Sequence, residues 1–268
     1  MAKVAIEAGK VGPLRVDATR RRPFRDALLE VVALGGGVIL WEVLGWVLAM
    51  PWLPPFSKIV AALIQFIQSG VILVNVASSL EGLAIGFGLS LIVGLFVGAL
   101  MGRYRRVEKA LDIYVNALLI SPAMIFAPIF FAIFGLSGAV RIAVIIMYSV
   151  FVIIMNTATA IRTVDPALVE MASSFGANER QIFLRILLPA SLPLIFAGIR
   201  LGMGRAVKGM INGEMLIAMV GLGALAQRYG SQFEASKVFA IALVVLIIGV
   251  VMNWLVQILD HRFTSWVN

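Results

Sequence analysis

The sequence predicts an all-α membrane protein with about six transmembrane helices. Apolar residues make up 61% of the 268 residues, whereas charged residues make up only 13%. The mean hydropathy is +1.02, well above that of an ordinary soluble domain. Apolar runs long enough to cross a bilayer as helices recur along the chain. A membrane barrel would instead need short strands of alternating polarity, and the sequence shows no such alternation.

The predicted spans lie in chain order at roughly residues 27–49, 82–102, 111–134, 139–161, 190–219 and 237–259. Residues 1–26 precede them, carry seven of the lysines and arginines, and contain no small-residue cleavage site. We therefore expect residues 1–26 to form a retained cytoplasmic arm. Residues 27–268 then form one transmembrane domain.

Lysine and arginine are distributed unevenly between the two sides of the predicted spans. With the N-terminus inside, the inner segments hold 15 of the 22 basic residues. The outer segments hold only Lys58, Arg141, Arg228 and Lys237. By the positive-inside rule, both termini are expected to be cytoplasmic. The net charge of +8 therefore requires no nucleic-acid partner.

Other patterns concern how the spans are connected and packed. Pro51–Gly70 has Ser57 in a capping position and apolar residues at helical spacing, which predicts a helix lying on the outer membrane surface. Val71–Glu81 is apolar but interrupted by polar residues, so we expect an interfacial lead-in and not a seventh span. Glycines four apart in the second and fifth spans predict faces for close helix packing. They are Gly82, Gly86, Gly94, Gly98, Gly102, Gly198, Gly202, Gly209 and Gly213.

The segment between the fourth and fifth spans, Val164–Pro189, is expected to form two short helices. Asp165, followed by proline, predicts the start of the first, because its carboxylate accepts the unpaired amides of a first turn. Gly176 is expected to end that helix in a left-handed conformation. Asn178 then caps the second helix, and Pro189 marks the return to the bilayer. The apolar residues available to a partner or to the bundle are Leu168, Val169, Ala172, Phe175, Ile182, Phe183 and Ile186.

The same segment resembles the EAA signature of permease subunits of binding-protein-dependent ATP-binding-cassette (ABC) importers, E-A-A-x3-G-x9-I-x-L-P. Its residues at the family spacing are Glu170, Met171, Ala172, Gly176, Ile186, Leu188 and Pro189. Only Met171 departs from the pattern. The resemblance runs from about residue 78 to the end and includes GIRLGMGRA (198–206), Glu214 and GLG (221–223). These stretches resemble the branch that imports nitrate, sulfonates, taurine and pyrimidine-type precursors.

This resemblance implies a type I importer fold in which the segment forms coupling helices seated in a groove of a cytoplasmic ATPase. The ATPase-coupling residues that it implies are Glu170, Met171, Ala172, Gly176, Ala177, Ile186, Leu188 and Pro189. It also implies a second copy of this chain, two cytoplasmic ABC ATPase subunits that hold ATP and magnesium, and a periplasmic or extracellular substrate-binding protein. The expected location is the bacterial cytoplasmic (inner) membrane, and no cofactor is expected in this chain.

Charged residues inside the spans are candidates for the transport pathway, because a central charge costs roughly 2.5–3.5 kcal/mol unless it is paired or wetted. Arg205 and Lys208 lie three apart on one face of the fifth span, which predicts a positive strip for a small anionic or polar solute or an oxyanion. Glu214 either neutralises a neighbouring cation or anchors an outer gate. Ser121 and Pro122 complete the candidates, because prolines there are expected to bend the third span beside a cavity. A kink that only improves packing is the alternative.

Other classes of function have little support in the sequence. A phosphate-binding P-loop is absent, since Lys10 is followed by Val11 where Ser or Thr is required. The chain has one histidine, His261, and no cysteine, so we expect no metal site and no catalytic residue. Two rivals to ATP-driven import remain. An ion-coupled secondary carrier predicts inverted repeats and buried acidic relays, and a membrane enzyme would have to use Glu and Lys pairs.

Overall fold

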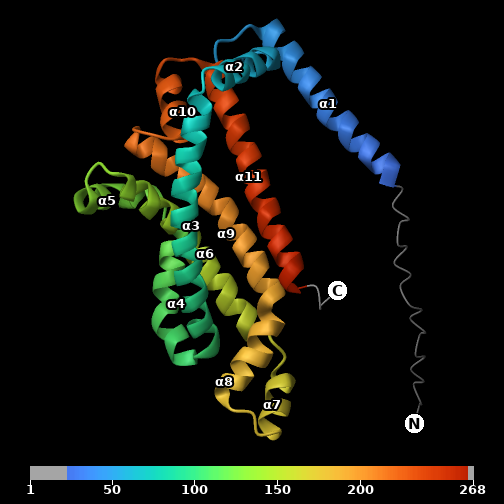
Figure 1. Cartoon of the computed structure of the whole chain (residues 1–268), viewed down its shortest axis with the longest axis vertical. Helices are drawn as coiled ribbons and strands as arrows, with labels where there is room; N and C mark the ends of the chain where they lie inside the picture. The colour runs from blue at the N-terminus through green and yellow to red at the C-terminus, as the bar shows by residue number, and fades with distance from the viewer. Residues whose placement is uncertain (1–22, 265–268) are drawn as a thin grey trace, which may run out of the picture.

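The computed structural model describes residues 23–264, with side chains from residue 32 onward. These residues form helices and no strands (Figure 1). The helices are α1 (Pro23–Leu48), α2 (Phe56–Gln68), α3 (Val71–Arg103), α4 (Arg105–Ile120), η1 (Ala123–Phe126), α5 (Ala127–Phe134), α6 (Gly138–Arg162), α7 (Pro166–Ser174), α8 (Glu179–Ile182), η2 (Phe183–Leu187), α9 (Leu188–Ile217), α10 (Leu222–Ser231) and α11 (Ala235–Thr264). Residues 1–22 of the predicted cytoplasmic arm lie outside the described range.

Four helices of the described chain are long and apolar enough to cross a membrane. They are α3, α6, the run Glu179–Ile217 that joins α8, η2 and α9, and α11. The pair α4 and α5 adds a fifth if it is counted as one bent span. In α1 the apolar part within the described side chains is Val32–Leu48, which is shorter than a full span. Among the described residues, four or five of the six predicted spans therefore meet these criteria.

The predicted third span, residues 111–134, is broken. Its two halves meet at 98°, so that α5 turns away from the bundle (Figure 1). The break follows from Pro122, which provides no amide and forces the preceding Ser121 into an extended conformation with ψ 134°. The hydroxyl of Ser121 donates to the carbonyl of Ala117 at 2.7 Å and so closes the end of α4.

The expected lead-in Val71–Glu81 is instead the beginning of α3, one continuous helix of 33 residues. Its polar residues do not interrupt the helix because they have partners. Asn75 donates to the carbonyl of Val71 at 2.8 Å and accepts from the amide of Gly221 at 3.0 Å. The boundary predicted from hydropathy at residue 82 was therefore wrong.

The centre of the bundle is α6, which packs against both α3 and α9. Ile145 and Ile153 of α6 are wholly buried. A Cβ on Gly86 would lie 2.7 Å from Ile145, and one on Gly94 would lie 2.7 Å from Ile153. From the α9 side, a Cβ on Gly202 would also reach within 2.7 Å of Ile153. The predicted glycine packing faces are thus confirmed, with α6 as the helix that both of them contact.

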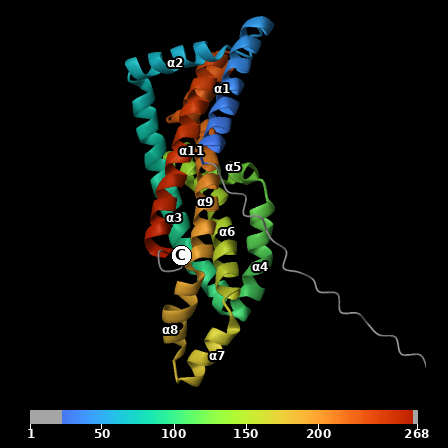
Figure 2. The ribbon, with the colours of Figure 1, turned by 90° about the vertical axis from the view of Figure 1, so that its right-hand side faces the viewer.

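The helix α2 lies crosswise over one end of the bundle and joins α1 to α3 (Figure 2). Ser57 does not cap it, contrary to the prediction: the cap position is Pro55, without a side-chain bond. The carboxylate of Glu42 in α1 accepts instead from the amide and the hydroxyl of Ser57, at 2.9 and 2.8 Å. Ile59 and Phe66 of α2 are buried, whereas Ile64 is 48% exposed.

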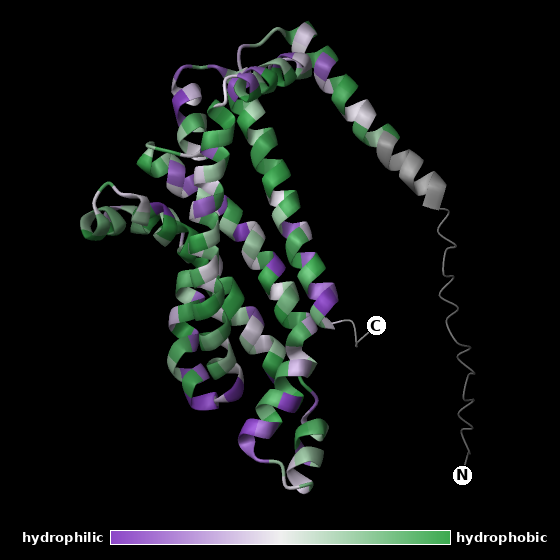
Figure 3. Cartoon of the chain, in the orientation of Figure 1, coloured by the Kyte–Doolittle hydropathy of each residue, from purple (hydrophilic) through white to green (hydrophobic). Residues whose placement is uncertain are grey.

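The opposite end carries α7 and α8, which extend beyond the C-terminal ends of α3 and α6 (Figure 1). Hydrophilic residues gather here, whereas hydrophobic residues cover most of α3 and α11 (Figure 3). Two ion pairs connect helices at this end. Arg103 of α3 pairs with Glu179 of α8 at 2.6 Å, and Arg162 of α6 pairs with Glu108 of α4. The polar loops that sequence analysis assigned to the cytoplasm therefore meet in one place.

Candidate coupling loop and transport pathway

The first helix of the predicted coupling loop, α7, is terminated at both ends by local hydrogen bonds. The carboxylate of Asp165 accepts from the amide of Ala167 at 2.9 Å. At the other end Gly176 has φ +78°, as predicted. The amides of Gly176 and Ala177 each donate at 3.0 Å, to the carbonyls of Ser173 and Ala172 respectively. These two bonds are the Schellman pattern that a left-handed residue permits.

The second helix begins where predicted but does not end at Pro189. Asn178 and Gln181 form a reciprocal capping box, each side chain accepting from the backbone amide of the other at 2.9 Å. From Glu179 the helix continues to Ile217, with residues 183–187 in π geometry. Pro189 lacks the amide that would bond four residues back, and the wider π turn lies directly before it. The predicted return point is therefore part of one continuous helix.

A small core of its own holds the loop together. Ala172, Ile182 and Leu187 are buried, and Val164, Val169 and Ile186 pack against them. The ion pair between Arg103 and Glu179 ties this unit to α3. Residues 175–178 join α7 to α8, and α8 runs on without a break through η2 into the long helix α9.

The outer face of α7 is apolar and exposed. Leu168, Met171 and Phe175 follow one another at helical spacing and are 40, 53 and 86% exposed. Glu170 is exposed beside them. Such a face on a protruding helix is typical of a protein interface.

The eight predicted coupling residues therefore occupy different positions in this unit. Glu170, Met171 and Gly176 are exposed, Ala172 is buried, and Ala177, Ile186, Leu188 and Pro189 are partly buried. Half of these residues thus lie partly covered inside the loop or at its junction with α9. Leu168 and Phe175, which lie outside the signature, contribute to the exposed face of α7.

The bend between α4 and α5 borders a cavity of about 230 Å³. It brings together three of the predicted pathway residues, Ser121, Pro122 and Arg205, with Tyr148 of α6. The hydroxyl of Tyr148 accepts from Asn212 of α9 at 2.7 Å. Tyr148 and Asn212 were not among the residues predicted from the sequence, although a polar side chain inside an apolar run is a signal for such a site.

Arg205 and Lys208 are exposed on α9. Neither forms an ion pair with any residue in the range 32–264. Arg200, by contrast, pairs with Asp260 of α11 at 3.2 Å. Only Arg205 among the charged pathway candidates lines the cavity at the bend.

Glu214 is placed elsewhere and is wholly buried. Its carboxylate accepts from the hydroxyl of Ser79 and from the amide of Gly223, both at 2.9 Å. The hydroxyl of Ser79 in turn accepts from the amide of Leu222 at 2.9 Å. A Cβ on Gly221 would lie 2.2 Å from the carboxyl carbon of Glu214, which explains a glycine at that position. Together these groups fasten the start of α10 to α3 and α9.

Replacing Glu214 with alanine is expected to lower the free energy of unfolding by about 2–3 kcal/mol, because a buried amide and a buried hydroxyl lose their acceptor. Thermal unfolding of the purified protein in lipid measures the change. Glu81→Ala is the matched control. The side chain of Glu81 is 67% exposed, and its contact with Arg141 is long, at 3.9 Å, so its loss should cost little stability. Equal melting temperatures for the two variants would contradict this role of Glu214.

Comparison with known proteins identifies the family. The profile of the binding-protein-dependent transport system inner membrane component matches residues 90–265. The nitrate import permease NrtB of Leptolyngbya laminosa is 30% identical, over 70% of this chain and 67% of that protein. The taurine transport permease TauC of Escherichia coli K12 is 25% identical, over 92% of this chain and 94% of that protein.

A solved structure shares the fold. A chain of the MetNI methionine ABC transporter, crystallised in inward-facing conformations, superposes with a TM-score of 0.57 at 19% identity. The match covers 75% of this chain and 98% of that chain. The chain therefore belongs to the family of inner membrane components of binding-protein-dependent transport systems, the permease subunits of ABC importers, and it resembles the nitrate, sulfonate and taurine branch of that family.

Proposed function

We propose that two copies of this chain form the membrane pathway of an ATP-driven, binding-protein-dependent importer of a small anionic or polar organic solute or oxyanion. The observation that carries the proposal is α7, a capped and protruding helix with an exposed apolar face. Two cytoplasmic ABC ATPase subunits hold ATP and magnesium and each receive one α7. A soluble binding protein delivers the solute on the opposite side of a bacterial inner membrane. Both termini are cytoplasmic.

The connection from α7 to α9 supports a mechanical role. Closure of the ATPases on ATP would draw the two α7 helices together. The small core of the loop and the continuous helix Glu179–Ile217 would pass that movement to α9. Because α9 packs on α6 along its glycine face, the movement is expressed as a rigid-body rotation between outward-open and inward-open states.

The charges on α9 support an anionic solute. Arg205 and Lys208 lack ion-pair partners among the described residues, and central charges are costly in a membrane unless they face water or protein. A second copy that presents the same face across a two-fold axis would double this positive strip. The names of the similar nitrate and taurine permeases describe anionic or zwitterionic cargo.

Reconstitution tests the function against its rivals. The chain would be assembled with its ATPase in proteoliposomes, and uptake of labelled nitrate, taurine and a small sulfonate would be measured with the binding protein present. We expect uptake that requires ATP, the ATPase and the binding protein together. Uptake by the chain alone, driven by a proton or sodium gradient, would identify a secondary carrier. A chemically altered product made by the chain alone would identify an enzyme.

Replacing Lys208 with methionine is expected to lower the rate of anion uptake at least about fivefold, because one surface-charge contact contributes about 1 kcal/mol to attracting an anion. The melting temperature should stay within the error of the wild type, since Lys208 is exposed and without an ion pair. Arg228→Met, an exposed cation on α10, is the control and should keep full uptake. Unchanged uptake in Lys208→Met would assign Lys208 to the structure and not to the pathway.

A further inference from the structure

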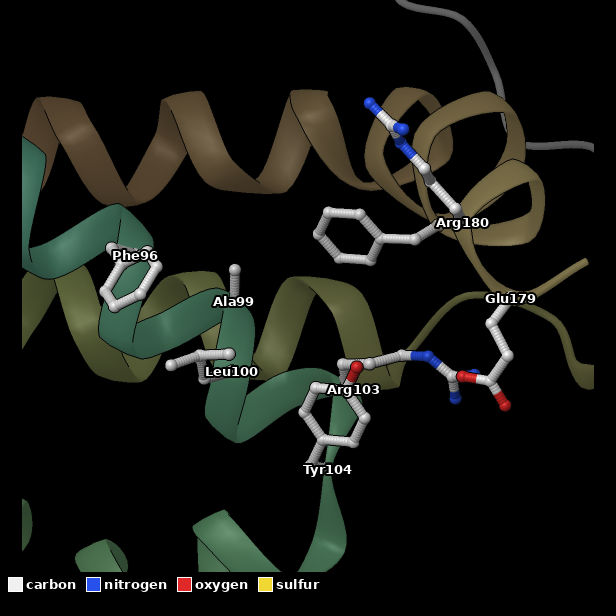
Figure 4. Close-up of a pocket in the computed structure, with 8 residues that line it drawn as sticks. Phe96, Ala99, Leu100, Arg103, Tyr104, Glu179 and Arg180 are labelled. Atoms are coloured by element: carbon white, nitrogen blue, oxygen red, sulfur yellow. The ribbon is translucent and has the colours of Figure 1, made fainter.

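A second cavity, of about 390 Å³, lies between the end of α3 and the start of the helix Glu179–Ile217 (Figure 4). Its α3 wall is formed by Phe96, Ala99 and Leu100, and its rim by Arg103, Tyr104 and Arg180. The lining also includes Glu179 and Phe183. Nothing in the proposed transport cycle uses this cavity, which lies apart from the exposed face of α7 and from the cavity at the bend.

The rim has an excess of positive charge. Arg103 is paired with Glu179 at 2.6 Å, and the two charges cancel. The guanidinium of Arg180 forms no hydrogen bond or ion pair with a residue in the range 32–264. Arg105 and Arg106, which begin α4 next to Tyr104, are exposed. An anion at the rim would therefore find one free guanidinium, that of Arg180, whereas Arg103 points toward Glu179 (Figure 4).

The interior of the cavity is apolar on its α3 wall, and beyond the cavity the exposed apolar face of α3 continues. Ile92 and Phe96 are 69 and 66% exposed and lie on the same face of α3 as Arg103, at four- and seven-residue steps. This face of α3 is therefore an apolar strip that ends at the positively charged rim of the cavity. A free inorganic anion would use only the rim, whereas an amphiphile would use both parts.

We propose that the cavity binds one anionic phospholipid per chain. The phosphate accepts from Arg180, and an acyl chain lies along Phe96 and Ile92. Planar guanidinium groups are well suited to phosphate oxygens, and basic pockets between membrane helices bind anionic headgroups. The walls of the cavity come from α3 and from the helix that continues into α9. A bound lipid therefore holds α8 against α3 and thereby fixes the position of α7.

Native mass spectrometry of the full-length protein tests this site, with dioleoyl phosphatidylglycerol and dioleoyl phosphatidylcholine added to delipidated samples. We expect one phosphatidylglycerol to be retained per chain at concentrations where phosphatidylcholine is lost. Arg180→Gln should weaken retention at least about tenfold, since it removes a charge-assisted hydrogen bond. Arg185→Gln, on the same helix but outside the cavity lining, should lose no more than the general surface attraction of about fivefold.

A second variant tests the apolar part without altering charge. Ala99→Trp would fill the cavity beneath the rim, and we expect it to abolish retention of phosphatidylglycerol. Equal retention of the two lipids would overturn the proposal, as would equal loss in Arg180→Gln and Arg185→Gln. Displacement of the lipid by millimolar inorganic phosphate would indicate a free-anion site instead. One-for-one displacement by the ATPase would show that a protein covers the cavity, and the lipid site would be rejected.

Discussion

Replacing Gly176 with valine is expected to reduce ATP-driven uptake about fivefold or more while the protein stays inserted in the membrane. The backbone of Gly176 has φ +78°, where a β-branched residue is strained by about 1–3 kcal/mol. A penalty of this size lowers the equilibrium constant between native and non-native loop conformations roughly 5- to 150-fold. The Schellman bonds of Gly176 and Ala177 are lost with it, and α7 no longer presents Phe175 in a fixed direction.

Gly176→Asn separates backbone strain from the loss of a small residue. No atom lies within 4 Å of a Cβ at this position, so a side chain meets no steric obstacle. Asparagine tolerates the left-handed conformation much better than valine, and this variant should keep most of the uptake. The measurements are uptake and substrate-stimulated ATP hydrolysis in proteoliposomes, with membrane insertion followed by quantitative immunoblot. Wild-type rates in Gly176→Val would contradict a fixed coupling loop.

Replacing Gly98 with leucine is expected to lower the free energy of unfolding by about 3 kcal/mol, at the upper end of the cost of overpacking. A Cβ at Gly98 would lie 2.7 Å from the carbonyl oxygen of Ile154 and 2.7 Å from the Cβ of Thr157. The first of these atoms belongs to the backbone of α6 and cannot rotate away. The helix α3 must therefore move off α6, and both its packing and the burial of Met101 are lost.

Gly88→Leu is the matched control for this substitution. It lies on the same helix, and no atom lies within 4 Å of a Cβ built on it. Its leucine should leave the melting temperature near that of the wild type, or slightly higher, because glycine is the weaker helix former. Thermal unfolding of both variants in the same lipid mixture compares them. A Gly98→Leu protein as stable as Gly88→Leu would show that α3 and α6 are not in close contact.

The coupling loop is the part of the structure that the sequence predicted in most detail. Asp165, Gly176 and Asn178 adopt the start, turn and cap assigned to them. These features depend on hydrogen bonds between residues two to five apart, so the local sequence is sufficient to predict them. The predicted return point at Pro189 lies within one continuous helix, which passes through a π turn just before it.

Several polar residues were misread because their partners are remote in the sequence. Ser57 was expected to cap its own helix, but its amide is bound by Glu42, 15 residues away. Asn75 and Ser79 looked like breaks in an apolar run, yet they bind the amides of Gly221 and Leu222. No periodicity within one segment could have revealed these pairs.

The sequence by itself determined that this is an all-helical membrane protein, which helix faces pack closely, and where a capped loop interrupts the spans. Composition, helical period and capping residues act within a few turns of helix, and their physical consequences need no knowledge of the rest of the chain. Proline also predicted the bend in the third span, but only the tertiary structure decided the burial of Glu214 under the start of α10 and the separation of Arg205 from Glu214. Each depends on which distant helices come into contact, because a buried charge or a broken helix is stable only where another segment supplies the missing hydrogen bonds or packing.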